Sequence, residues 1–309
     1  MSSFALLLVV LRFFTGALDT AQQQLLGVFD IFSGNQTVAD FAQSLNYLIG
    51  PIRNLSYADL ALDTKAAIIT DVHSGRILYS KNSTTQLPIA SLTKIMTALV
   101  VLDQHGDQLN TVISVPAEAV NVTGSKMSLY ANEKITIHNL LKGMLIESAN
   151  DAATALAYTI NGNPKDFVAS MNQKAGSLGL IGTHFTNPVG FDDDQHYSTA
   201  EDVVKLASAA MDNKVFADIV ATPKATVRDV TGKFVHQLIT TNKLLSQYKN
   251  VIGIKTGTTD EAGESLVAAV SGDSGQTVIV VLLDSPNRFQ EGKKALDWAL
   301  KAYSWIEPL

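Results

Sequence analysis

Lys255-Thr256-Gly257-Thr258 closes a short run of β-type residues that begins at Val251. Well upstream the chain reads Ser148-Ala149-Asn150, and before that Ser91-Leu92-Thr93-Lys94. The three motifs follow one another in the order S-x-x-K, S-x-N and K-T-G. Together they predict an acyl-transfer site that is built on serine and lysine and does not need histidine.

The order of the motifs matters more than any one of them. An S-x-x-K pattern also occurs at Ser246–Lys249, and S-x-N recurs at several positions, whereas K-T-G occurs once. The settings agree with the prediction as well. Ser91 precedes a helix with an apolar face, Ser148 lies at the expected end of a helix, and Lys255 is expected to end a strand.

Ser91 and Lys94 are the expected nucleophile and base. At positions i and i+3 of a helix their side chains project from the same face within mutual reach. A lysine with its ordinary pKa of about 10.4 is protonated at neutral pH and cannot accept a proton. Burial and a second cation both lower that pKa, and Lys255 is the candidate for the second cation.

Strand patterns occur near both ends of the chain and helical patterns occupy the middle. Ala66–Thr70 and Ile77–Tyr79 predict a hairpin, and strands are expected again at 251–255, 265–270 and 277–283. Apolar residues recur with helical spacing between about 91 and 221, where Thr199 is expected to cap a helix that runs through Ala210. A last helix is expected from about Arg288 to Trp305.

This pattern predicts an α+β fold: one antiparallel sheet built from both chain ends, with helices packed on it and a helical subdomain. The corresponding domain prediction assigns residues 1–55 to a secretory or anchoring segment and an N-terminal lead. It assigns residues 56–309 to a catalytic domain with a helical insertion at about 91–221.

Composition excludes several classes of site and partner. The 309 residues carry a net charge of −6 with a pI near 5.5, so no basic surface favours nucleic-acid binding. Cysteine is absent, which rules out disulfides, thiolate nucleophiles and cysteine-bound zinc. The six histidines show no metal-ligand spacing, and surface or packing roles are expected for them. We expect no metal and no cofactor.

The N-terminus resembles a secretory segment. An apolar run from Phe4 to Leu11 is followed by the small residues Thr15, Gly16 and Ala17. No Lys or Arg precedes the apolar run, and Arg12 stands where apolar residues are expected. A wrongly assigned start of the chain, an uncleaved anchor and a buried amphipathic helix therefore remain alternatives. The run is short for an ordinary transmembrane helix.

With these motifs, the chain resembles the serine-type D-alanyl-D-alanine carboxypeptidases. These are the low-molecular-mass penicillin-binding proteins, which have the β-lactamase/transpeptidase-like fold. The resemblance extends from about Lys65 to Asp284. The supporting matches are Gly124-Ser125-Lys126-Met127, Asn187-Pro188-Val189-Gly190, Thr241-Asn242-Lys243-Leu244-Leu245 and Lys255-Thr256-Gly257-Thr258-Thr259, continued by Ala262-Gly263.

The resemblance implies roles for the first two motifs. Ser91 would attack the carbonyl between the two terminal D-alanines while Lys94 takes its proton, and the acyl-enzyme would then be hydrolysed. Ser148 would relay protons to the leaving amine, and Asn150 would hold the substrate amide.

It implies equally definite roles for the third motif. Lys255 would raise the local positive potential, and Thr256 and Thr258 would bind the terminal carboxylate. Gly257 fits a close approach of backbone to substrate. The backbone N–H groups of Ser91 and Thr258 would form the oxyanion hole.

The expected partners are peptidoglycan stem peptides that end in D-Ala-D-Ala, with β-lactam antibiotics as inhibitors. Relatives often carry a further β-rich domain and an anchoring helix after the catalytic domain, for which little sequence remains before Leu309. We therefore expect an extracytoplasmic protein, secreted or anchored at the bacterial envelope, with any membrane contact through the N-terminus. The chain also differs from the family at Phe191, a position where relatives more commonly have an aliphatic residue or histidine.

Two local patterns compete with this interpretation. Gly272-Asp273-Ser274-Gly275 matches the surroundings of the nucleophile in trypsin-like proteases, but these are ordinary turn residues between two expected strands. His196 follows Asp192-Asp193-Asp194, which would suit a metal, although a solvated acidic loop is the better interpretation.

Two alternative functions remain. A β-lactamase must deacylate fast, and the class A enzymes do so with a glutamate in an E-x-x-L-N loop, which is not found between Asn150 and Lys255. A non-catalytic penicillin sensor or peptidoglycan-binding module would not need Ser91 and Lys94 together.

Overall fold

The computed structural model describes residues 50–273 and 275–305, and Gly50–Trp305 forms one compact unit. Its helices are the 3-10 turn η1 (Ala90–Leu92), α4 (Thr93–His105), α5 (Ala117–Val120), α6 (Ile137–Ile146), α7 (Asn150–Asn161), α8 (Pro164–Ser177), α9 (Ala200–Met211), α10 (Lys214–Val220), α11 (Leu244–Gln247) and α12 (Arg288–Ala302). Its strands are β1 (Ile52–Arg53), β2 (Ala66–Asp71), β3 (Ile77–Lys81), β4 (Val112–Ser114), β5 (Lys134–Thr136), β6 (Lys224–Arg228), β7 (Val235–Ile239), β8 (Val251–Thr259), β9 (Gly263–Ser271), β10 (Thr277–Ser285) and β11 (Tyr303–Ser304).

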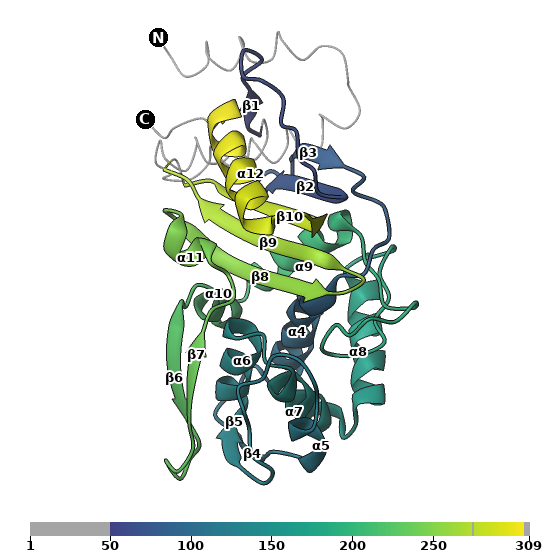
Figure 1. Cartoon of the computed structure of the whole chain (residues 1–309), viewed down its shortest axis with the longest axis vertical. Helices are drawn as coiled ribbons and strands as arrows, with labels where there is room; N and C mark the ends of the chain where they lie inside the picture. Colours follow the sequence, from purple (N-terminus) through teal and green to yellow (C-terminus); the bar gives the residue numbers. More distant parts are fainter. Residues whose placement is uncertain (1–49, 274, 306–309) are drawn as a thin grey trace, which may run out of the picture. The chain divides into compact units, whose positions relative to one another are not determined.

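The main sheet has the order β3-β2-β10-β9-β8 and is antiparallel throughout. Its first two strands come from the early part of the described chain and the other three from the late part (Figure 1). The predicted α+β fold, with one antiparallel sheet made from both ends, is confirmed. Strand β8, which carries the K-T-G motif, is an edge strand.

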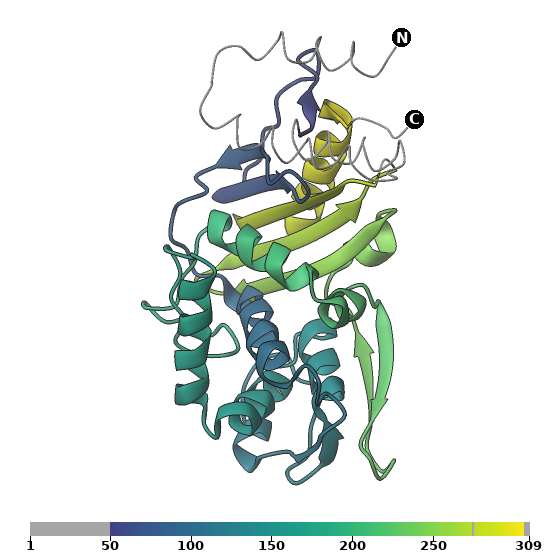
Figure 2. The ribbon, with the colours of Figure 1, turned by 180° about the vertical axis from the view of Figure 1, so that it is seen from behind.

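Alternation along the strands builds two cores, one on each face of the sheet. Val278, Val280 and Leu282 of β10 pack in the cluster that contains Leu296 and Ala299 of α12. The intervening β10 side chains, such as Ile279 and Val281, pack in the larger cluster with the helical region. Helix α12 therefore covers one face, and Figure 2 shows α9 across the other.

The helical region lies below the sheet in Figure 1. Helix α4 is buried along most of its length, from Thr93 to Leu102, and packs against α7, α8 and α9. Thr199 caps α9 by accepting a hydrogen bond from the Asp202 N–H at 3.0 Å, as predicted, and the helix ends one residue beyond Ala210.

Several sequence-based boundaries are wrong. The last helix ends at Ala302, short of the predicted Trp305, because Tyr303 and Ser304 pair as β11 with β1. Lys255 does not end its strand, since β8 continues to Thr259 opposite β9. Strands also return before residue 251, in the β6–β7 hairpin, and a β4–β5 pair interrupts the helical middle.

The predicted secretory segment, and most of the 1–55 lead, lies outside the described residues. Among the described helices, none combines the length and the apolar character needed to cross a membrane.

Candidate active site

Ser91 and Lys94 meet at the start of the central helix. Ser91 lies in η1 and Lys94 in the first turn of α4, so one chain turn places the two side chains together. The Lys94 Nζ donates to Ser91 Oγ at 2.8 Å and to the carbonyl oxygen of Val189 at 2.7 Å. Lys94 has no exposed surface. The structure thus pairs the predicted nucleophile with the predicted base.

The backbone around Ser91 is tightly enclosed by two glycines. A Cβ atom added at Gly257 would lie 3.0 Å from the Ser91 amide nitrogen and 2.9 Å from the Ile89 oxygen. One added at Gly190, where φ is +89°, would lie 1.8 Å from the Ala90 oxygen. Only glycine permits these approaches, so β8 and the 187–190 loop can close on the Ser91 turn.

Lys255 and Ser148 form a second serine–lysine pair. The Lys255 Nζ donates to Ser148 Oγ at 2.8 Å and to the Thr256 carbonyl at 2.9 Å. Ser148 lies in the short link between α6 and α7 with a positive φ of 63°, a sparsely populated conformation for a non-glycine residue. Tertiary packing therefore holds this serine where the lysine of β8 can reach it.

The pKa values of both lysines lie below their ordinary range. Burial is the main cause for Lys94, and the charge of Lys255 adds to it, so the pKa of Lys94 falls well below its usual value even though Asp151 acts in the opposite direction. Burial, followed by the charge of Arg288, lowers the pKa of Lys255 to about 7. The expectation that Lys255 depresses the pKa of Lys94 agrees with this arrangement.

Asn150 begins α7 and is held by the loop before it. Its Nδ2 donates to the Thr123 carbonyl and its backbone N–H donates to the Ser125 carbonyl, both at 2.7 Å. The neighbouring Asp151 accepts from the backbone N–H of Met127 at 3.1 Å. The loop that carries the Gly124-Ser125-Lys126-Met127 match is therefore fixed against the S-x-N motif.

The hydroxyls of the third motif meet partners that were not predicted. Thr256 Oγ1 shares a hydrogen bond with Thr241 Oγ1 at 2.7 Å. The Arg288 guanidinium donates to the Gly257 carbonyl at 2.7 Å and to Thr258 Oγ1, while its Nε is buried without a partner. Arg288 thus adds a cation to the K-T-G motif.

Sequence reasoning missed Arg288, although one signal was present. It occupies the first position of α12, immediately after the Asn287 cap. A cation in the first turn of a helix opposes the helix dipole, so such a residue invites a functional explanation.

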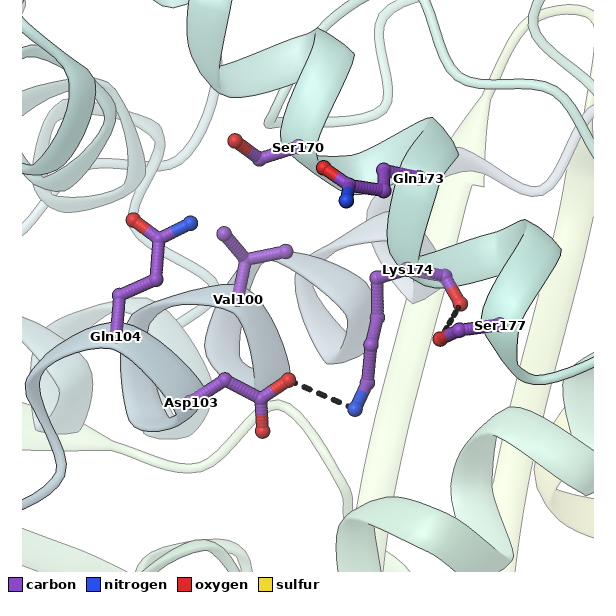
Figure 3. Close-up of a pocket in the computed structure, with 7 residues that line it drawn as sticks. All are labelled: Val100, Asp103, Gln104, Ser170, Gln173, Lys174 and Ser177. Carbon is purple, nitrogen blue, oxygen red and sulfur yellow. Dashed lines mark hydrogen bonds and ion pairs between the residues drawn. The ribbon is translucent and has the colours of Figure 1, made fainter.

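A surface groove elsewhere on the helical region has no part in this cluster. It has a volume of about 280 Å³ and lies between α4 and α8, where Lys174 pairs with Asp103 at 2.7 Å (Figure 3). Its lining on α4 begins at Val100, more than a helical turn beyond Lys94.

The competing patterns have structural explanations within the described residues. Gly272 and Gly275 lie in the connection between β9 and β10 and bond to each other at 3.1 Å, as a turn requires, while Ser274 itself lies outside the description. His196 is buried and bonds to Thr93 Oγ1 at 2.7 Å. In the described part of the chain, no group of three or more histidine or acidic side chains is placed to hold a metal ion.

Comparisons with known proteins agree with one another. Residues 54–287 match the family model described as D-alanyl-D-alanine carboxypeptidase, peptidase S11. The chain is 34% identical over 251 residues to D-alanyl-D-alanine carboxypeptidase DacF of Bacillus subtilis, covering 80% of this chain and 64% of that protein. It is 36% identical over 242 residues to a D-alanyl-D-alanine carboxypeptidase of a Streptomyces species, covering 73% of this chain and 83% of that protein.

A solved structure has the same fold. The DD-transpeptidase of a Streptomyces species superposes with a TM-score of 0.75 at 32% identity, covering 79% of this chain and all of the other.

Proposed function

The chain belongs to the D-alanyl-D-alanine carboxypeptidase family of serine peptidases, and we propose that it removes the terminal D-alanine from peptidoglycan stem peptides through an acyl-enzyme. The single observation that carries the proposal is the contact between the buried Lys94 amine and Ser91 Oγ at 2.8 Å. A lysine with a lowered pKa, held against a serine hydroxyl, is equipped to act as its general base.

In the first half-reaction, Lys94 takes the Ser91 hydroxyl proton as Oγ bonds to the carbonyl carbon between the two D-alanines. The C–N bond then breaks, and the leaving D-alanine amine needs a proton. Ser148 is the proposed relay, because its hydroxyl accepts from Lys255, whose pKa of about 7 allows it to exchange a proton at neutral pH. In the second half-reaction water attacks the acyl carbonyl and gives up a proton, which replaces the one lost from the Ser148–Lys255 pair. The acyl–oxygen bond breaks and Lys94 returns its proton to Ser91 Oγ.

The proposed substrate lies along strand β8. An edge strand can pair with an extended peptide through its free backbone groups, and Gly257 brings β8 close to the Ser91 amide. The N–H groups of Ser91 and Thr258 are the proposed donors to the oxyanion, and Asn150 would hold the amide on the acyl side.

Binding of the substrate's terminal carboxylate is assigned to Lys255, Thr256 and Thr258, joined by Arg288. The guanidinium is already in contact with Thr258 Oγ1, and charge-assisted hydrogen bonds to a carboxylate are the strong ones. Binding of a carboxylate would explain why the chain keeps two basic side chains, those of Lys255 and Arg288, in the largely buried surroundings of the K-T-G motif.

We also assign catalysis to residues 56–309 and secretion or anchoring to residues 1–55. The motifs support the first assignment, since all of them fall inside the compact unit. An extracytoplasmic location, secreted or anchored at the cell envelope, follows from the substrate. β-Lactams are the expected inhibitors, because they present a strained amide and a carboxylate to the same groups.

A paired assay tests the proposal. Acyl-D-Ala-D-Ala peptides with a free and an amidated C-terminus are compared by release of D-alanine or D-alanine amide. We expect the amidated peptide to lose most of the turnover, because its charge-assisted hydrogen bonds are gone and the cations stay unpaired. Equal rates on the two peptides would contradict the carboxypeptidase assignment and favour another acyl transfer on the same scaffold.

A further inference from the structure

His196 carries a buried imidazole to which the proposed mechanism assigns no role. The residues directly before it, 191–195, are all exposed, whereas only 3% of the His196 surface is exposed. The fully buried ring of Phe185 meets it edge to face, with ring centres 5.6 Å apart. Burying a polar ring without hydrogen bonds is costly, so the partners of its two nitrogens indicate what the ring does.

Both ring nitrogens have partners, and these fix the tautomer. Nδ1 lies 3.1 Å from the backbone nitrogen of Thr186, whose N–H can only donate, so Nδ1 is the acceptor. The proton of the neutral ring is then on Nε2, which donates to Thr93 Oγ1 at 2.7 Å. Burial lowers the pKa of His196 to about 4, although Asp193 acts in the opposite direction, so the ring is neutral at neutral pH. The imidazole therefore joins two segments of the chain and keeps no lone pair for acid–base chemistry.

Thr186 begins the loop that reaches the proposed base. Asn187 Oδ1 accepts from the backbone N–H of Val189 at 3.2 Å and from that of Gly190 at 2.7 Å, which folds the loop into a tight turn. The turn presents the Val189 carbonyl to Lys94 Nζ at 2.7 Å. The N–H that His196 holds thus lies three residues before the carbonyl that holds the lysine.

The two contacts of His196 lie on either side of the proposed base. Thr93 immediately precedes Lys94 at the start of α4, and the loop on the other ring nitrogen carries Val189. A neutral amine has two hydrogens and one lone pair, and the lone pair must face the Ser91 hydroxyl if Lys94 is to take its proton. The Val189 carbonyl accepts one of the hydrogens. Its position therefore helps to turn the lone pair toward the serine.

We propose that His196 is a positioning residue for Lys94. Its imidazole ties Thr93 of α4 to the loop of residues 186–190 and so keeps the Val189 carbonyl on the Lys94 amine. The ring itself touches neither the substrate nor the reacting atoms. The inference rests on the proposed function, because it takes Lys94 as the base of Ser91.

His196→Phe in the full-length protein tests the proposal, because it keeps a ring and removes both hydrogen bonds. Asp192 still ties the loop to Thr259 of β8 at 2.5 Å, so we expect the variant to fold. The kcat for D-alanine release should fall about a hundredfold, the loss that misplacing a catalytic group by about 1 Å can cause. KM should change little, because the carboxylate-binding groups stay in place.

Two further variants give the comparison. His196→Gln retains a donor that can reach Thr93 Oγ1, so it should recover most of the lost kcat. His138→Phe makes the same replacement as His196→Phe at a half-buried histidine of α6 and should leave kcat near wild-type. Wild-type kcat in folded His196→Phe, or a loss confined to KM, would overturn the proposal.

The pH profile separates positioning from a general structural role. Burial is the main cause of the lowered pKa of Lys94, and a displaced loop would admit water to the amine and raise that pKa. The acid limb of Ser91 acylation by a β-lactam should therefore move to higher pH in His196→Phe, by about half a unit or more. It should stay in place in His138→Phe. An acid limb that does not move in His196→Phe would reduce the histidine to a packing role and overturn the proposal.

A second variant and a structure keep the inference testable if an earlier step fails. If His196→Phe does not fold, Thr93→Val removes the other partner of the same hydrogen bond with a side chain of the same shape, and wild-type kcat there would also overturn the proposal. If the wild-type protein releases no D-alanine, the proposed function fails, and a crystal structure of the folded variant decides. A Val189 carbonyl beyond hydrogen-bond distance of Lys94 Nζ supports positioning, and an unchanged contact rejects it.

Discussion

The helical region and the sheet each supply a buried lysine that donates to a serine at 2.8 Å, but the two pairs are built differently. Ser91 and Lys94 are three residues apart on one turn of chain, whereas Ser148 and Lys255 are 107 residues apart and meet only when β8 packs against the link between α6 and α7. A local pair can be predicted from spacing. A distant pair depends on the whole fold.

The pairs also differ in their electrostatics. Lys94 has its pKa lowered well below the ordinary value by burial and by Lys255, while the pKa of Lys255 is lowered to about 7 by burial and Arg288. The lowered pKa suits the first lysine to accept a proton, whereas the second, with a pKa of about 7, is divided between its charged and neutral forms at neutral pH. The difference supports the proposal that the helical region supplies the base and the sheet supplies the charge that binds the carboxylate.

Removing the lysine of the local pair should have the largest effect. Lys94→Ala is expected to lower β-lactam acylation about a thousandfold or more, since the Ser91 hydroxyl loses its base. Because Lys94 is fully buried, thermal unfolding must be measured in parallel. Acylation near the wild-type rate in a folded variant would show that Lys94 is not the base.

Ser148→Ala tests the distant pair and should cost less. It removes the proposed proton relay and leaves the Lys255 amine without its serine partner, so we expect about a hundredfold loss of D-alanine release. Binding of the substrate should change little, because the carboxylate-binding groups remain. Stopped-flow acylation and steady-state turnover separate the two effects, and a loss confined to KM would argue against a relay.

Arg288→Met sharpens the comparison on the sheet side. The variant should raise KM for free-acid peptides about tenfold, because one charge-assisted partner of the terminal carboxylate is lost. The amidated peptide serves as the internal control and should be unaffected. An equal loss on both peptides would mean that Arg288 only supports the Gly257–Thr258 backbone.

The smallest effect concerns pH. Raising the pH through about 7 removes the charge of Lys255, so kcat/KM should fall several-fold between neutral pH and about pH 9 as carboxylate binding weakens. As the proposed base, Lys94 would act in its neutral form, so its titration should limit the rate only on the acid side of its lowered pKa. In Lys255→Arg the charge persists, and the alkaline decline should disappear, whatever the absolute rate. An unchanged decline would point to another group.

The sequence alone predicted the features that depend on local repeats. The short apolar, β-type runs of β2, β9 and β10, the helical spacing after Ser91 and the Thr199 cap each reflect neighbours along the chain, and they led to the correct α+β fold. The serine and lysine of the S-x-x-K motif could be placed together for the same reason.

Features made by distant contacts were missed. Arg288 reaches Gly257 across 31 positions of sequence. The β6 strand, with only Val227 buried, has too weak an apolar pattern to be recognised. The last helix ends before the predicted residue because Tyr303 pairs with Arg53 of β1, a strand near the start of the described chain. In each case tertiary pairing, rather than local pattern, decides the outcome.

The most direct test of the central claim is a mass spectrum of the full-length protein after incubation with a β-lactam, followed by peptide mapping. If Ser91 is the nucleophile and Lys94 its base, one β-lactam should add covalently and the modified peptide should contain Ser91. An adduct on Ser246 or Ser274, or no adduct on folded protein, would contradict the account.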